Sequence, residues 1–181
     1  VDYFLEEYGA GNTPNPCVVC NKEIKFGLLL EKAFELGADF VATGHYVKTR
    51  KAEDGKKKTE YKLLKGKDKN KDQSYFLWQL NQRQLKHILF PVGDYTKGQV
   101  RKMAQRFKLP TAKTPESMEI CFVKDKVEDF LARYLKQKPG KIIDNAGKVL
   151  GGHQGLSFYT IGQRKGLRIS GGPYYVVRKD I

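Results

Sequence analysis

The chain has 181 residues, of which 40% are hydrophobic and 12% aromatic, a composition typical of a globular protein and not of a disordered one. Its formal net charge of +14 at pH 7 suits a polyanion such as RNA, because basic groups near phosphates release condensed counterions, although a merely soluble lysine-rich surface would carry the same charge. No apolar run approaches the ~20 residues of a membrane span and no secretory leader is present, so we expect no membrane partner and a cytoplasmic protein.

The first part of the chain has the pattern of an α/β layer. Residues 3–8 predict the end of a helix, and a loop rich in Gly, Asn and Pro follows at 9–16. An amphipathic helix that ends at Gly37 comes next. Its apolar positions are Phe26, Leu29, Leu30, Ala33 and Leu36. Residues 40–43 predict a short buried strand, closed by Gly44-His45, and this order of helix, glycine, strand and glycine favours a parallel sheet.

The middle of the chain predicts a hairpin and two capped helices. Strands at 46–49 and 60–64 flank a lysine-rich turn at 51–58, which we expect to be a solvated tip rather than an RNA contact. Asn81 with Gln84 precedes the apolar residues Leu85, Ile88 and Leu89 of one helix. Thr96 with Gln99 begins the other, which ends at Leu109-Pro110.

After Phe122 the character of the sequence changes. We expect a short helix at 127–135, a hairpin formed by 142–143 and 149–150, frequent glycines, and a last strand at 173–177. A domain boundary is therefore expected between residues 122 and 128. Both ends of the chain resemble cut ends, since the first helix has no start signal and the last strand has no partner.

Three cysteines make a disulfide scaffold unlikely and fit a reducing cytoplasm. Cys17 and Cys20 form a C-x-x-C where the loop meets a helix. A helix N-terminus lowers the pKa of a thiol, and Lys22 and Lys25 would add to that effect, so we expect Cys20 to be reactive. A zinc site would need a second pair of ligands, which Cys121 and three scattered His do not supply. Cys121, between Ile120 and Phe122, is by itself typical of a buried strand thiol.

Eight short segments, in order from about residue 12 to the end, carry further motifs. They are Thr13-Pro14-Asn15-Pro16-Cys17, Cys20-Asn21-Lys22-Glu23-Ile24-Lys25-Phe26, Ala42-Thr43-Gly44-His45-Tyr46, Asn70-Lys71-Asp72-Gln73-Ser74-Tyr75-Phe76-Leu77, Leu89-Phe90-Pro91-Val92-Gly93, Glu119-Ile120-Cys121-Phe122, Gly151–Gly155 and Thr160-Ile161-Gly162-Gln163-Arg164-Lys165-Gly166-Leu167. Together they closely resemble the tRNA-specific 2-thiouridylases. The resemblance implies the C-terminal part of a nucleotide-binding parallel-sheet (PP-loop ATP pyrophosphatase-like) α/β domain at 1–124. A small mixed α+β domain that contacts tRNA is implied at 125–181.

The resemblance also implies an activity, the replacement of the 2-oxygen of the wobble uridine of tRNA by sulfur. ATP with Mg²⁺ activates that oxygen, and a cysteine persulfide delivers the sulfur. By resemblance Cys121 is the persulfide carrier, loaded by a cysteine desulfurase or a sulfur relay protein. Cys20 is the nucleophile that frees the sulfide or closes a disulfide, in agreement with its expected low pKa.

Further residues take roles only through the resemblance. Asn15, Pro16 and Cys17 would line the pocket of the flipped-out target base. Gly44 would approach ATP at the carboxyl end of a strand. The residues implied in tRNA contacts are His45, Lys71, Asp72 and Gln73, to which we add the basic turn Gln163, Arg164 and Lys165.

Two departures from the family pattern matter. Many members have Asp in place of Cys17, so Cys17, Cys20 and Cys121 could instead hold an iron–sulfur cluster. The S-G-G-x-D-S-type loop that wraps the pyrophosphate of ATP is absent from this sequence, as is the C-terminal β-barrel. We therefore expect the 181-residue chain alone to be inactive.

Two alternatives stay open. An ATP pyrophosphatase of the same superfamily, such as an amidating ligase acting on a small molecule, would need neither the charge of +14 nor the pair Cys20 and Cys121. A non-catalytic RNA-binding module would tolerate replacement of both cysteines.

Overall fold

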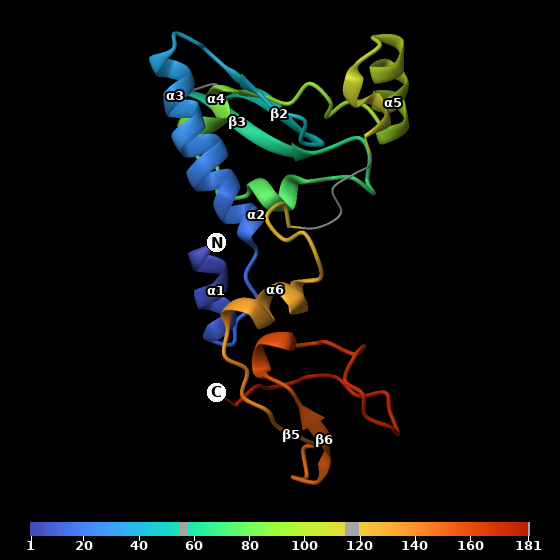
Figure 1. Cartoon of the computed structure of the whole chain (residues 1–181). Helices are drawn as coiled ribbons and strands as arrows, with labels where there is room; N and C mark the ends of the chain where they lie inside the picture. The colour runs from blue at the N-terminus through green and yellow to red at the C-terminus, as the bar shows by residue number, and fades with distance from the viewer. Residues whose placement is uncertain (55–57, 115–119, 181) are drawn as a thin grey trace. The chain divides into compact units, whose positions relative to one another are not determined.

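The computed structural model describes residues 1–54, 58–114 and 120–180, and the chain divides into two compact units (Figure 1). One unit combines Val1–Pro16 with Ser117–Ile181, and the other comprises Cys17–Glu116. Each unit has an apolar core of its own.

A continuous helical run opens the unit Cys17–Glu116. It consists of α2 (Pro16–Val19), the π-helix η1 (Cys20–Leu28) and α3 (Leu29–Glu35). A Cβ on Gly27 would lie 3.0 Å from the carbonyl oxygen of Lys22, five residues earlier, so the wide turns of η1 favour glycine there. The helix ends with Gly37 in the left-handed region at φ +80°, as the sequence predicts.

The predicted apolar face of this helix is only partly correct. Phe26 and Leu30 are buried, but Leu29 is 52% exposed and Leu36 is 76% exposed. The i→i+5 pattern of η1 displaces the residues that follow around the helix axis. A stripe drawn at α-helical spacing therefore does not stay on one face.

A parallel strand pair places this unit in the α/β class, as predicted. β1 (Val41–Ala42) pairs with β4 (Ile88–Leu89). Two expectations are wrong here. The strand at 40–43 is not buried, since Phe40 is exposed and Val41 and Ala42 are partly or fully exposed. Ile88 and Leu89 are not helical, because α4 (Gln82–Lys86) ends at Lys86 and the chain turns back to pair with β1.

The other elements of this unit follow the sequence closely. The hairpin of β2 (Val47–Asp54) and β3 (Lys58–Lys65) is confirmed. The turn predicted at 51–58 is too long, because residues 51–54 and 58 extend the strand pairing, and residues 55–57 lie outside the described residues. Both capping boxes are present, at the start of α4 and of α5 (Lys97–Arg106). Short 3-10 turns form η2 (Ser74–Leu77) and η3 (Pro110–Lys113). The core consists of Phe26, Val47, Leu77 and Ile88.

In the other unit, two segments far apart in the sequence lie side by side. Figure 1 shows α1 (Asp2–Gly9) next to α6 (Val127–Tyr134). Phe4 of α1 is the centre of the core, with its ring 5.3 Å from that of Phe122 and 6.0 Å from that of Phe130. Burial of these aromatic rings stabilises the unit.

The same unit contains the second predicted hairpin, β5 (Gly140–Ile143) paired with β6 (Val149–His153), and the 3-10 turn η4 (Leu156–Phe158). The strand predicted at 173–177 is wrong, since no strand is assigned there although all five residues are described. Two backbone hydrogen bonds hold this segment instead: the Gly162 N–H donates to Val176 O, and the Val176 N–H donates to Gln163 O. No helix among the described residues is long and apolar enough to cross a bilayer.

Candidate functional site

Cys20 lies within the helical run and not at its start. The run begins at Pro16, so Cys17 occupies the first turn and Cys20 follows one turn later. The expected position of Cys20 at a helix N-terminus is therefore wrong by one turn, because helix formation extends into the Pro-containing loop. Residues three apart on a helix face the same side. Cys17 is exposed, Cys20 is half-buried, and neither is in a disulfide with Cys121, the other described cysteine.

Asn21, which follows Cys20, is a buried polar residue that our sequence analysis did not single out. It is 2% exposed, and its Nδ2 donates to the Phe76 carbonyl at 3.2 Å, while its Oδ1 has no hydrogen-bond partner among the described residues. Asn21 precedes the buried Phe26 by five residues, the spacing of a π-helix. At α-helical spacing residues 21 and 26 would not be assigned to the same buried face, so the sequence pattern does not reveal Asn21. The bond fixes η2 against the helix that carries Cys20.

The carboxyl end of β1 holds the predicted ATP residue and a predicted tRNA residue. Gly44 is exposed, and no described atom lies within 4 Å of a Cβ built on it. His45 Nδ1 is 2.7 Å from Thr43 Oγ1, and the imidazole packs against Phe26 and Phe90. Burial, reinforced by the charge of Lys25, lowers the pKa of His45 to about 4. The ring is therefore neutral at pH 7.

The predicted tRNA-contact loop is held by its own polar side chains. Asp72 accepts hydrogen bonds from the Gly66 N–H at 2.8 Å and from Ser74 Oγ at 2.7 Å. Burial raises the pKa of Asp72, but these hydrogen bonds and the charge of Lys65 outweigh it, so the pKa is lowered. Gln73 Oε1 accepts from the Tyr46 N–H at 3.0 Å. Asp72 and Gln73 therefore shape the loop, whereas Lys71 is half-buried beside them.

Cys121 is on an exposed turn in the other unit. The Val123 N–H donates to Ile120 O at 2.9 Å and closes the turn. Ile120 and Phe122 pack against the core around Phe4. The apolar neighbours that suggested a buried strand thiol are therefore anchors that leave the thiol in solvent. Glu119, the first residue of this motif, lies outside the described residues.

Two more predicted contact regions meet in this unit. Thr13 Oγ1 and Thr160 Oγ1 are 3.0 Å apart, which joins the loop of the half-buried Asn15 and Pro16 to the turn of Gln163, Arg164 and Lys165. Gln163 stabilises that turn, accepting from the Thr160 N–H and donating to the Lys165 carbonyl. Arg164 and Lys165 are exposed.

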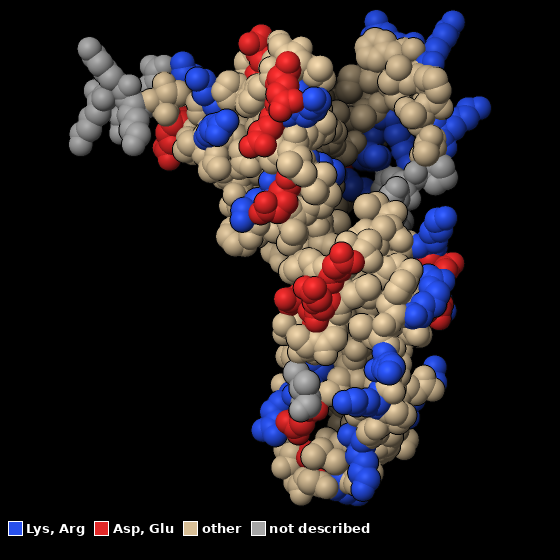
Figure 2. Space-filling model, turned by 60° about the vertical axis from the view of Figure 1, so that its left-hand side comes forward, with Lys and Arg blue, Asp and Glu red and all other residues tan. Residues whose placement is uncertain are grey.

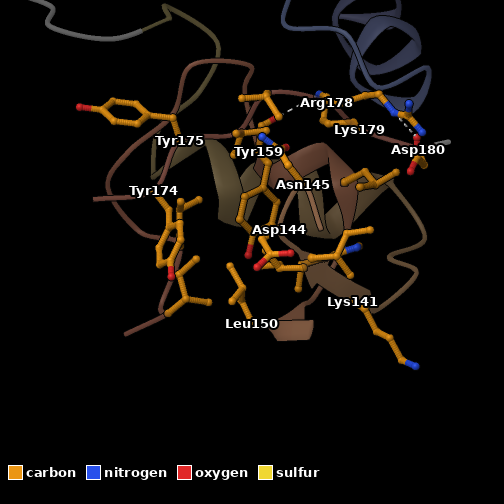
Figure 3. A pocket seen from close by; sticks show the side chains of 18 of the residues that line it. Lys141, Asp144, Asn145, Leu150, Tyr159, Tyr174, Tyr175, Arg178, Lys179 and Asp180 are labelled. Carbon is orange, nitrogen blue, oxygen red and sulfur yellow. Dashed lines mark hydrogen bonds and ion pairs between the residues drawn. The ribbon is translucent and has the colours of Figure 1, made fainter. Parts of the chain in front are cut away.

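A pocket of about 610 Å³ lies between the β5–β6 hairpin and the segment that follows residue 173. Figure 3 shows Tyr159 and Tyr174 along it, with Lys179 donating to the Tyr159 carbonyl and Arg178 paired with Asp180. None of the described residues that line it is a predicted site residue or a cysteine. The pocket is therefore separate from the predicted thiol chemistry.

The predicted site residues are thus divided between the units. The unit Cys17–Glu116 contains Cys17, Cys20, Gly44, His45 and residues 71–73, and the other contains Asn15, Pro16, Cys121 and residues 163–165. No group of three His, Cys, Asp or Glu side chains among the described residues could hold a metal ion. Figure 2 shows Lys and Arg side chains spread over the face in view and not gathered in one patch. The distribution of charge on this face does not by itself indicate where RNA would bind.

Comparisons with known proteins agree over the whole chain. The family model described as tRNA methyl transferase HUP domain matches residues 1–125, and that described as tRNA methyl transferase PRC-barrel domain matches residues 128–181.

Among individual proteins, the chain is similar to the tRNA-specific 2-thiouridylase MnmA of Syntrophomonas wolfei, with 51% identity over 99% of this chain and 53% of the relative. It is also similar to MnmA 2 of Thermoanaerobacter sp., with 55% identity over 100% of this chain and 50% of the relative. For MnmA of Proteus mirabilis the identity is 53%, over 99% of this chain and 50% of the relative. The chain spans about half the length of these curated relatives.

Proposed function

Because this chain belongs to the tRNA-specific 2-thiouridylase family, as its family-model matches and relatives show, we propose that the protein containing it transfers sulfur to tRNA. The product is 2-thiouridine at the wobble position. The matching family models are described by methyl transfer, whereas the relatives are named for the formation of 2-thiouridine in tRNA. Cys20 and Cys121 favour the sulfur chemistry named in the relatives.

The proposed reaction uses the two cysteines in sequence. ATP with Mg²⁺ makes the 2-oxygen of uracil a leaving group, and the exposed Gly44 would approach the nucleotide. A donor, either a cysteine desulfurase or a sulfur relay protein, loads Cys121 as a persulfide. The Cys20 thiolate then attacks Cys121 Sγ, and the persulfide S–S bond breaks to release the outer sulfur as sulfide. The sulfide attacks C2 of the adenylated uracil, and AMP leaves with the 2-oxygen. This leaves a Cys20–Cys121 disulfide, which two electrons from a thiol reductant reopen.

The observation that carries the proposal is the exposed turn of Cys121. A persulfide carrier must meet a donor protein and then a second thiol, so its sulfur has to be accessible. Ile120 and Phe122, packed into the core around Phe4, hold the backbone while the thiol stays in solvent. Such an arrangement supports sulfur transfer and is unexpected for an inert structural thiol.

The RNA contacts are proposed at the positions implied by the family. Asn15, Pro16 and Cys17 would surround the extruded uracil. His45 would take part as a neutral hydrogen-bonding group, since its pKa of about 4 removes the cation at pH 7. Asp72 and Gln73 would act through the shape of their loop. Lys71, Gln163, Arg164 and Lys165 would approach RNA phosphates or base edges.

The test measures 2-thiouridine by mass spectrometry in tRNA treated with the full-length protein containing this chain, ATP, a persulfide donor and a reductant. We expect Cys20→Ser and Cys121→Ser each to reduce the product more than about 100-fold. Cys17→Ser tests the proposed base pocket separately: it removes a thiol of the same C-x-x-C without removing either proposed reactive sulfur, so Cys121 should still be loaded as a persulfide. In Cys20→Ser, the Cys121 peptide should gain the mass of one sulfur atom.

Three outcomes would point elsewhere. Full thiolation by both serine variants would contradict the proposed roles. Retained tRNA affinity with no ATP-dependent product from any variant would favour a non-catalytic RNA-binding module. ATP hydrolysis stimulated by a small molecule but not by tRNA would favour a small-molecule ligase. The 181-residue chain alone is proposed to be inactive, which the same assay checks directly.

An iron–sulfur cluster on Cys17, Cys20 and Cys121 remains a hypothesis. All three cysteines are free in the structure. Anaerobic reconstitution followed by iron counting tests it, and an iron-free protein that still thiolates tRNA would exclude it. We also propose a domain boundary between residues 124 and 125. We further propose that the protein acts in the cytoplasm, where thiols stay reduced.

A further inference from the structure

Two large aromatic side chains stand exposed on the turn that follows the predicted tRNA-contact loop. Tyr75 is 67% exposed and Trp78 is 66% exposed, whereas Leu77 between them is 1% exposed and belongs to the core. Tyr75 lies in the 3-10 turn η2, and Trp78 follows its last residue. Side chains three residues apart on a 3-10 turn eclipse one another. The two rings therefore project from the same side of the turn, and Leu77 projects from a different side, into the core.

The turn that carries this aromatic pair is tied to the helix that carries Cys20. The side-chain amide of Asn21, next to Cys20 in the chain, donates to the carbonyl of Phe76, which is the residue after Tyr75. Asn21 is buried at this contact, and Leu77 anchors the same turn in the core. The hydrogen bond between Asn21 and Phe76 is thus held on one side by the buried Asn21 and on the other by the buried Leu77. The hydrogen bond therefore keeps the turn of the two rings in a fixed position relative to the helix of the proposed nucleophile.

The loop that leads to the aromatic pair is basic on its outside and acidic on its inside. Lys65, Lys67 and Lys69 are exposed. Asp68 is turned into the protein, where its carboxylate accepts from the Lys97 N–H at 2.9 Å and the Asn70 N–H at 3.1 Å. Asp72 likewise accepts from the Gly66 N–H. Exposed ammonium groups beside exposed aromatic faces are the features that bind single-stranded nucleic acid.

We propose that Tyr75 and Trp78 form a stacking platform for unpaired RNA bases that flank the target uridine. This proposal rests on the proposed thiolation of tRNA and deepens it, by assigning a binding surface to residues for which no role has been suggested. When one base is extruded from a loop, its neighbours lose a stacking partner, and an aromatic side chain can take the place of that partner. Exposed aromatic rings at the end of a loop with three exposed lysines suit a polyanion with unpaired bases, such as RNA.

Trp78 allows a direct test, because it is the single Trp of the chain. The protein is titrated with an RNA stem-loop that carries an unpaired uridine-containing loop, and its tryptophan fluorescence is compared with that of the Trp78→Phe variant. The difference between the two fluorescence signals is the contribution of Trp78. We expect saturable quenching by the stem-loop and not by a fully paired duplex of the same length. Tyr75→Ala and Trp78→Ala should each weaken binding about 10-fold, and Tyr75→Phe should restore it.

Phe107→Ala provides the matched control. Phe107 is 65% exposed in the same unit, at the end of α5, and has no part in the proposed platform. Its replacement should leave RNA affinity unchanged. Thermal unfolding checks that all variants fold, as expected for exposed side chains.

The proposal is overturned if both alanine variants bind the stem-loop as tightly as the parent, or if only a sulfur-donor protein, without RNA, quenches Trp78. Its failure is distinct from failure of the proposed function. Loss of thiolation in Cys20→Ser with unchanged RNA affinity in Tyr75→Ala would reject the platform alone. If Tyr75→Ala and Trp78→Ala weaken RNA binding but Cys20→Ser still thiolates tRNA fully, the sulfur chemistry alone is rejected.

Discussion

The imidazole of His45 lies between Phe26 and Phe90 at the carboxyl end of β1, with Nδ1 hydrogen-bonded to Thr43 Oγ1. Burial keeps this ring neutral at pH 7, so it cannot attract RNA phosphates as a cation. At the residue scale, then, the state of a side chain depends on what packs against it. Cys121 is the converse case, since its neighbours Ile120 and Phe122 are partly buried against a core while its own side chain is exposed.

His45 makes the stability of the protein depend on pH in a definite direction. Its folded pKa of about 4 lies below the ordinary value of 6.5, so the unfolded state binds more protons between these two values. The free energy of unfolding should therefore fall as pH decreases from 6.5 towards 4. Because the ring is partly exposed, we expect the free energy of unfolding to fall by on the order of 2 kcal/mol, which is less than the full pKa shift would give. Urea unfolding at several pH values measures this, and an equal pH dependence in His45→Gln would refute it.

At the scale of elements, the start of β2 is enclosed by backbone from two loops. A Cβ on Gly66 would overlap the carbonyl oxygen of Tyr46, and a Cβ on Gly93 would overlap that of Val47. Gln73 bonds to the backbone of Tyr46 at the same place. Glycines therefore allow the predicted tRNA-contact loop to rest directly on the first residues of the hairpin.

Replacement of Gly93 tests this close approach. Gly93→Ala should destabilise the protein by about 2 kcal/mol or more, because the backbone of β2 must move to admit the methyl group. Gly98→Ala is the matched control, since no described atom lies within 4 Å of a Cβ there and the residue is in α5. That change should be neutral, or stabilising by less than about 1 kcal/mol. Chemical denaturation measures the free energy of unfolding of both variants. Equal values would contradict the close approach of Gly93 to the backbone of β2.

At the scale of the whole molecule, the chain contains two separate apolar cores. The core around Phe4 joins residues from the first helix of the chain to residues after 120, and the core around Phe26 and Ile88 lies within the other unit. The turn of Cys121 depends on the first of these. The segment before residue 16 therefore supports a cysteine more than 100 positions away in the sequence.

Phe4→Ala should destabilise one unit selectively. Removing a buried phenylalanine leaves a cavity that typically lowers stability by about 3–5 kcal/mol. Hydrogen exchange should become faster in the amides of α6 while those of β2 and β3 stay protected. Equal loss of protection in both regions would show that the two cores unfold together. Alkylation of Cys121 provides a second measurement, since its turn is expected to loosen with the core.

The sequence by itself determined the features that depend on near neighbours: both capping boxes, the two hairpins, the glycine that ends the long helix, and the motifs that identify the family. Tertiary structure decided what depends on distant partners. Ile88 is a strand residue because Val41 is available to pair with it. Asn21 is buried because η1 is a π-helix. Cys121 is exposed because Phe4 draws its neighbours into a core, and local spacing carries no information about a residue so far away in the chain.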